Sequence, residues 1–192
     1  MPTEHIKFTL LAAVLFLMAV TASQAANGDT VEVLASDGVK VYGEVYAGDL
    51  EENSPLILLF HQGGSNGRGE YSPLVPWLND LGFRVIAWDQ RSGGATYGSD
   101  NRTKGGLTSS EGVSYCDAYP DLQAGLDYVL NNELAEQVVV WGSSYSAALV
   151  FRLAADNPDR VAKIVAASPA RSARHVGHLV LGRRLRAARP VA

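Results

Sequence analysis

Hydrophobic and polar residues follow two patterns along the first two thirds of the chain. In residues 31–34 and 39–46 they alternate in part, and Ser36-Asp37-Gly38 separates the two runs. An Asp-Gly pair between alternating runs is typical of an antiparallel β-hairpin. Four later runs are short and mostly apolar, which is typical of strands covered on both faces. These runs are residues 56–60, 83–88, 138–141 and 161–166.

Segments with helical spacing lie between these runs. Residues 71–81, 121–130 and 145–155 carry apolar residues three or four positions apart, and in the first segment these are Leu74, Trp77, Leu78 and Leu81. Strands that alternate with helices imply right-handed crossovers and parallel strands. The pattern therefore predicts an α/β fold with a mostly parallel, doubly wound sheet, an N-terminal antiparallel hairpin and one core over residues 26–170.

The clearest chemical signal is a buried strand, 138–141, that leads through a tight turn directly into a helix. A residue at such a turn takes a strained conformation, so the positions two residues away on either side must be small. Ser144 meets this condition, because Gly142 and Ser146 flank it. Ser143 has bulky residues at these positions, and Ser146 lies further into the helix. Ser144 is therefore the candidate nucleophile; the open alternative is that it only caps the helix.

A second motif, His61-Gln62-Gly63-Gly64, directly follows the run 56–60. Two more segments, Asp89-Gln90-Arg91-Ser92-Gly93 and Pro158-Asp159-Arg160-Val161, come at the end of one predicted strand and the start of another. With these motifs the chain resembles the α/β-hydrolase superfamily over about residues 30–170, closest to its dienelactone-hydrolase, esterase and peptidase-like branches. It departs from the family's G-x-S-x-G pattern at the last position, where Ser146 replaces glycine.

The resemblance implies a serine hydrolase of ester or amide bonds. Ser144 would attack the substrate, and the main-chain N–H groups of Gln62 and Tyr145 would form the oxyanion hole, which needs two donors aimed at the developing negative charge. His61 would stabilise its turn, and Asp89 and Arg91 would fix loops by charge-assisted hydrogen bonds. We expect a small-molecule or peptide substrate and neither a cofactor nor a metal.

The catalytic triad is the weak point of this interpretation. A histidine base and an orienting acid should follow the nucleophile in the chain. Asp156 lies about 17 Å down the predicted helix from Ser144, at the wrong end. His175 follows the sixth predicted strand and has no acid after it, so it is only a weak candidate for the base. The resemblance implies further strands that the sequence lacks, and we expect little or no turnover. A non-catalytic relative with this fold and a truncated product without activity are the alternatives.

The first 25 residues predict export. Lys7 precedes an apolar run of 13 residues, 8–20, and the small side chains of Ser23 and Ala25 fit a cleavage site after Ala25. The run is shorter than the roughly 20 residues of a membrane-spanning helix. We therefore expect a periplasmic or secreted protein without stable membrane insertion after cleavage; an uncleaved anchor is the alternative.

Charge is distributed unevenly. All 20 acidic residues lie at or before Asp159, whereas residues 171–192 hold six arginines and no acid. An acidic body argues against nucleic-acid binding, which needs clustered cations. The basic atypical tail has three interpretations: a frame-shifted end, a basic amphipathic helix that docks on the acidic body or on a membrane surface, or an ordinary surface helix. Cys116 is the only cysteine, so no intrachain disulfide can form, and we expect it to be packed inside.

Overall fold

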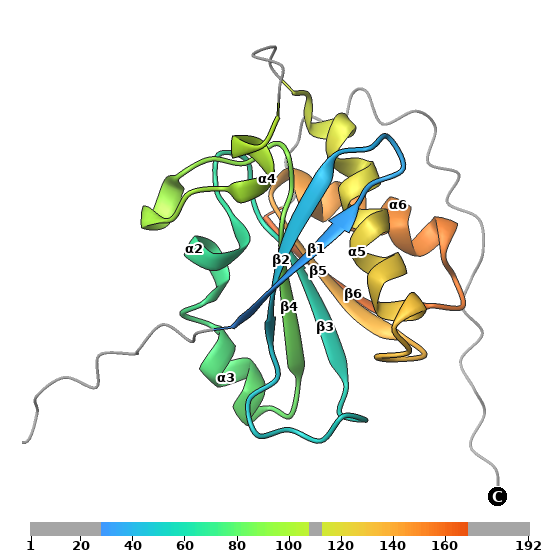
Figure 1. Ribbon diagram of the computed structural model, residues 1–192. Helices are drawn as coiled ribbons and strands as arrows, with labels where there is room; N and C mark the ends of the chain where they lie inside the picture. The colour runs from blue at the N-terminus through green and yellow to red at the C-terminus, as the bar shows by residue number, and fades with distance from the viewer. Residues whose placement is uncertain (1–27, 108–112, 169–192) are drawn as a thin grey trace, which may run out of the picture.

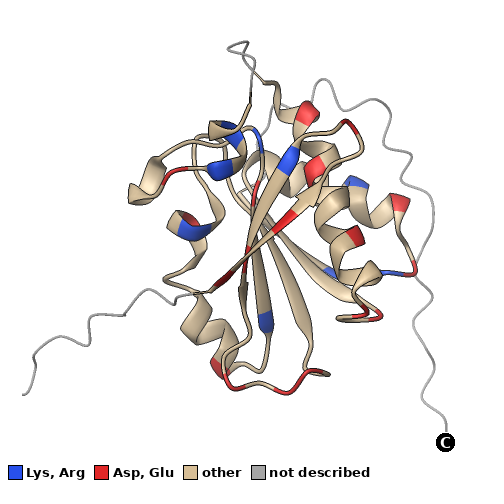
Figure 2. Cartoon of the chain, in the orientation of Figure 1, with Lys and Arg blue, Asp and Glu red and all other residues tan. Residues whose placement is uncertain are grey.

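The computed structural model describes residues 28–107 and 113–168. The predicted signal segment, 1–25, lies outside these residues, and so does the basic segment, 171–192, with the candidate base His175. In the described part of the chain, no helix has both the length and the apolar character needed to cross a membrane. Basic and acidic residues are interspersed over the elements of this part (Figure 2).

A single six-stranded sheet forms the centre of the molecule (Figure 1). Its order is β1-β2-β4-β3-β5-β6. The first two strands run antiparallel to each other, β2 is antiparallel to β4, and β3 to β6 are parallel. This confirms the predicted fold class. The strands are β1 (Asp29–Leu34), β2 (Lys40–Tyr46), β3 (Leu56–Phe60), β4 (Arg84–Asp89), β5 (Val138–Ser143) and β6 (Val161–Ala167).

Helices cover both faces of the sheet (Figure 1). Since side chains alternate along a strand, Leu58 and Phe60 pack toward α5 and α6, whereas Ile57 and Leu59 pack toward α2 and α3. All five residues of β3 are buried, which explains its wholly apolar sequence. The helices are α2 (Gly67–Tyr71), α3 (Val75–Asp80), α4 (Arg102–Gly105), α5 (Tyr119–Asn131) and α6 (Tyr145–Asp156), with 3₁₀ turns η1 (Thr96–Gly98) and η2 (Tyr115–Ala118).

The predicted helix 71–81 is wrong in its continuity and in its buried face. The structure divides the segment between α2 and α3, since Pro73 and Pro76 lack the N–H groups that a continuous helix requires. Val75 and Leu78 face the sheet, whereas three of the four residues assigned to the apolar face are exposed. The exposed fractions are 36% for Leu74, 53% for Trp77 and 55% for Leu81.

The last described strand, β6, also departs from expectation. It was predicted to be covered on both faces, yet Ala162, Lys163 and Val165 are exposed. Among the described residues it pairs with β5 alone and forms an edge of the sheet. Its sequence is apolar because one side packs on α6, not because both sides are covered.

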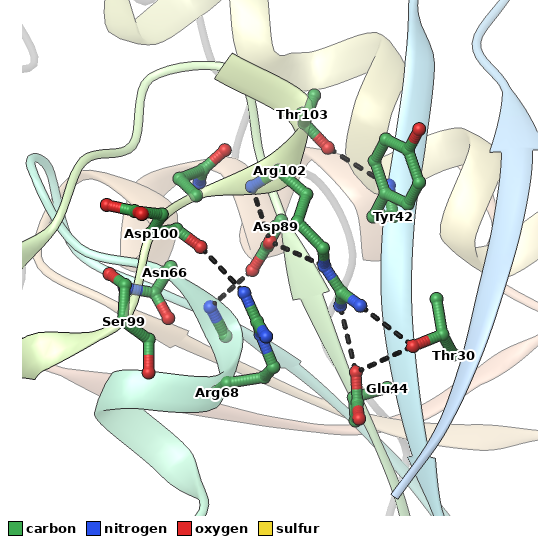
Figure 3. A network of polar contacts seen from close by, with 12 residues as sticks. Thr30, Tyr42, Glu44, Asn66, Arg68, Asp89, Ser99, Asp100, Arg102 and Thr103 are labelled. Atoms are coloured by element: carbon green, nitrogen blue, oxygen red, sulfur yellow. Dashed lines mark hydrogen bonds and ion pairs between the residues drawn. The ribbon is translucent and has the colours of Figure 1, made fainter. Parts of the chain in front are cut away.

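A buried carboxylate fixes the loops at the end of β4. Asp89 accepts hydrogen bonds from the main-chain N–H of Gly67, at 2.8 Å, and of Arg102, at 2.9 Å. The Arg102 guanidinium reaches Glu44 and Thr30, each at 2.9 Å (Figure 3). The start of α2 and the segment leading into α4 are thus held against the first two strands, as expected for the loop-fixing role of Asp89.

Arg91 also holds neighbouring segments together at the end of β4. Its buried guanidinium pairs with Asp121 of α5 at 2.6 Å and with Asp37 of the hairpin turn at 2.5 Å. Its main-chain N–H also donates to Asp121, at 2.8 Å. The hairpin, β4 and α5 are therefore tied together at a single charged side chain.

Candidate active site

Ser144 is the single residue between the end of β5 and the start of α6. Its backbone has φ 55° and ψ −115°, a combination that non-glycine residues rarely adopt and that costs on the order of 1–3 kcal/mol. The Ser144 N–H donates to the carbonyl of Ala167 in β6, at 2.9 Å. The predicted strained turn is therefore present at the predicted residue, and the neighbouring strand helps to hold it.

Gly142 is required by the closeness of this turn. A Cβ atom at this position would overlap the main chain of Ser146 and Ala147. The first turn of α6 therefore lies close against the end of β5, with Ser144 as the residue between the two elements.

Ser146 lies on the opposite side of the turn and is fully buried. Its hydroxyl donates to the carbonyl of His61 at 2.6 Å and accepts from the side-chain amide of Gln90 at 2.6 Å. The turn is thereby connected to the ends of β3 and β4. The sequence interpretation treated Ser146 only as a tolerated replacement for glycine, but its hydroxyl bridges three elements.

His61 occupies the turn after β3, completely buried. Its Nε2 accepts the main-chain N–H of Gln90 at 2.9 Å and lies 3.1 Å from the Asn101 amide nitrogen, while Nδ1 lies 2.7 Å from the carbonyl of Gln62. This pattern of partners places the proton on Nδ1. Burial lowers the pKa of His61 below its ordinary value of 6.5. His61 is the one histidine among the described residues, and with both nitrogens bonded it is not available as a base for Ser144.

The structure brings the two predicted oxyanion donors to the same edge of the sheet. Because β3 and β5 are parallel neighbours, with Phe60 opposite Gly142, the turns that follow them open on the same side. The Tyr145 N–H lies in the first turn of α6 and has no acceptor among the described residues. The Gln62 N–H, in contrast, donates to the carboxylate of Glu70 at 3.0 Å.

Comparison with known proteins agrees with this geometry. Residues 55–189 match the family described as the alpha/beta hydrolase fold. The chain belongs to the α/β-hydrolase fold family. Its relatives of known structure include an esterase from Pyrococcus furiosus, with 24% identity and a TM-score of 0.55 over 74% of this chain and 50% of that one. Epoxide hydrolase A from Mycobacterium thermoresistibile has 25% identity and a TM-score of 0.51 over 72% of this chain and 38% of that one. An α/β-hydrolase from Penicillium sp. sh18 has 16% identity and a TM-score of 0.57 over 73% of this chain and 45% of that one. The chain spans half or less of each of these structures.

The candidate site contains a residue that the sequence patterns did not reveal, Glu70. It lies on α2, at the end of the glycine-rich stretch that follows His61-Gln62. Nothing in the local pattern distinguishes its carboxylate from a solvent-exposed acid, because its contact with the Gln62 N–H depends on how the loop between them folds. A second expectation is wrong: Cys116 is exposed on η2 rather than packed inside.

The described residues of this α/β-hydrolase-fold chain contain no cluster of three or more His, Cys, Asp or Glu side chains arranged to hold a metal ion. Asp156, at the far end of α6, bonds to the Tyr119 hydroxyl at 2.5 Å and so is engaged away from Ser144.

We expect replacement of Ser146 by alanine to lower the free energy of unfolding by about 2 kcal/mol, since the His61 carbonyl and the Gln90 amide would be left buried without their partner. Urea denaturation measures the change. Ser36→Ala, in the exposed hairpin turn, is the matched control and should change stability by less than about 0.5 kcal/mol. Equal costs for the two variants would contradict a bridging role for the hydroxyl.

We also expect the stability to fall as the pH is lowered from 7.5 to 5.5. The unfolded chain protonates its histidine near pH 6.5, whereas burial disfavours protonation of the folded ring and lowers its pKa, so acid favours the unfolded state. The loss from one histidine across this window should be no more than about 1.4 kcal/mol. A chain with His5, His175 and His178 replaced by asparagine retains His61 as its only histidine, and chemical denaturation of this variant at both pH values excludes the contribution of the other histidines. A flat profile would contradict a neutral buried ring.

Proposed function

We propose that this chain is a serine hydrolase of ester or amide bonds with Ser144 as the nucleophile. The observation that carries the proposal is the strained turn at φ 55°, directly before a helix whose first N–H, that of Tyr145, has no acceptor in the described part of the chain. A hydroxyl at such a turn can attack a carbonyl carbon while the adjacent N–H group stabilises the negative charge that develops on the carbonyl oxygen.

The second oxyanion donor in this proposal is the N–H of Gln62. The hydrogen bond from Ser146 to the His61 carbonyl supports this role, because it fixes the Gln62 turn against the nucleophile turn. The amide becomes available to a substrate when the Glu70 carboxylate leaves it.

Proton transfer from Ser144 is the unassigned step, and on that account we propose slow turnover. His61 is engaged through both ring nitrogens, and the candidate base His175 lies outside the described residues. A nucleophilic serine without a positioned base typically has a kcat several orders of magnitude lower than one with a complete triad. We propose that the substrate is a small molecule or a peptide, and that the chain binds it after export to the periplasm or the exterior.

Binding without turnover is the second candidate function. It is favoured by a specific observation, the hydrogen bond from the Gln62 N–H to Glu70, which occupies a donor that catalysis would need.

Covalent labelling distinguishes the two functions. The full-length folded chain is treated with a neutral alkyl fluorophosphonate, and the modified serine is located by peptide mass spectrometry. A serine hydrolase gives an adduct on Ser144 that is absent when the chain is unfolded in urea before treatment. An intact folded chain without an adduct, or with adducts spread over exposed serines, would leave binding as the function.

A further inference from the structure

Glu70 is a carboxylate within the candidate site that has no cationic partner among the described residues. It is partly buried, and its Oε2 accepts the Gln62 N–H at 3.0 Å. The ion pairs of the described chain involve other acids. The nearest basic residue in the sequence, Arg68, extends its guanidinium to the Asp100 carbonyl instead, at 2.8 Å (Figure 3).

Two partly exposed aromatic rings lie beside the same turn. The Tyr97 hydroxyl accepts a hydrogen bond from the Gln62 side-chain amide at 2.8 Å, and this tyrosine is 61% exposed. Tyr115 stacks on the Tyr145 ring with centroids 4.5 Å apart, and its hydroxyl lies next to Gly63. One face of Tyr115 is covered by this stacking, yet the side chain remains 56% exposed.

The position of the Glu70 carboxylate opposes the chemistry of a serine hydrolase. An oxyanion hole stabilises negative charge through free N–H donors, and a carboxylate on one of these donors both blocks it and repels the forming oxyanion. The carboxylate must therefore move away before the transition state. A positive charge on the substrate provides both the reason for the movement and a new partner for the carboxylate.

We propose that Glu70 binds a cationic group of the substrate, an ammonium or guanidinium beside the rings of Tyr97 and Tyr115, and so selects esters or amides that carry a positive charge. Carboxylates pair with cations, and aromatic faces attract them as well. On binding, Glu70 exchanges the Gln62 N–H for the cation, which frees the amide for the carbonyl oxygen. The exchange step rests on the proposed function, whereas the cation site itself does not.

The test compares two soluble ligands of similar size, benzylammonium and benzyl alcohol, by NMR titration of the full-length chain. We expect benzylammonium to bind at least about tenfold more tightly than benzyl alcohol, with shifts at the Gln62 and Gly63 amides. In Glu70→Gln, the preference should fall to near equality. The glutamine retains an oxygen that accepts the Gln62 N–H, so the turn is kept while the charge is lost. Glu136→Gln removes the same charge from an exposed site outside the candidate active site and should leave the preference unchanged.

Several outcomes would overturn the proposal: equal affinities for the two ligands in the wild-type chain, a preference that survives in Glu70→Gln, or an equal loss in Glu136→Gln. Ser144→Ala separates this proposal from the proposed function. It removes the nucleophile, so fluorophosphonate labelling should be lost, and it leaves the cation site intact, so the preference for benzylammonium should remain. Tighter binding of benzylammonium without any fluorophosphonate adduct on Ser144 would therefore reject the hydrolase and retain the site. An adduct on Ser144 without any preference between the ligands would do the reverse.

Discussion

Replacing Ser144 with alanine should abolish fluorophosphonate labelling of the folded chain, because the hydroxyl that forms the bond is removed. The reagent forms a covalent bond to the serine oxygen, and at this turn the Ser144 hydroxyl stands directly before a helix N–H, that of Tyr145, which has no acceptor among the described residues. Labelling rates of the wild-type and variant chains, followed by intact-protein mass spectrometry, measure the effect.

A second substitution at the same position shows whether the loss is chemical rather than structural. Ser144→Gly also removes the hydroxyl, but glycine adopts φ 55° without the strain of a side chain. It should therefore raise the free energy of unfolding by about 1 kcal/mol while labelling stays absent. Residual labelling in either variant at the wild-type rate would show that another serine reacts.

Replacing Gly142 with valine should lower the free energy of unfolding by about 3 kcal/mol, the upper part of the range for overpacked interiors. The added side chain would meet the main chain of Ser146 and Ala147, which cannot move without displacing α6 from the sheet. Thermal and urea denaturation measure this loss, and labelling of Ser144 should disappear with it.

Gly105→Val is the matched control for that substitution. A Cβ atom at Gly105 would meet nothing within 4 Å, so the same change in α4 should cost no more than about 1 kcal/mol, the scale of helix propensity. If Gly142→Val were as stable as Gly105→Val and still labelled on Ser144, the close return of the helix over the strand would be wrong.

The strands of the sheet could be predicted from the sequence because each is marked by a pattern of residues that are adjacent in the chain. The runs 56–60 and 138–141 are apolar because β3 is buried throughout and alternate residues of β5 are, and the turn at Ser144 is marked by small residues within two positions. The helix after β3 could not be placed the same way, since Pro73 and Pro76 interrupt a pattern whose spacing alone looks continuous.

Prediction of the site failed where contacts join distant parts of the chain. Ser146 and His61 are 85 residues apart, yet their hydrogen bond connects the two turns. Glu70 reaches the Gln62 N–H from α2, whose start is held by the hydrogen bond from the Gly67 N–H to Asp89. Such pairings depend on which strands become neighbours, so the sequence could name the residues around Ser144 but not the carboxylate beside them.

The hydrogen bond from the Ser144 N–H to the Ala167 carbonyl links the candidate nucleophile to β6, the outermost parallel strand, although much of β6 is exposed. The strained residue Ser144 is thus held in part by a strand that has a single neighbouring strand among the described residues, so we expect fraying of β6 to weaken the constraint on the turn. The reaction rate of the Ser144 hydroxyl should therefore depend on the stability of β6. A contact or substitution that stabilises or destabilises this strand, even at a distance from Ser144, should change that rate.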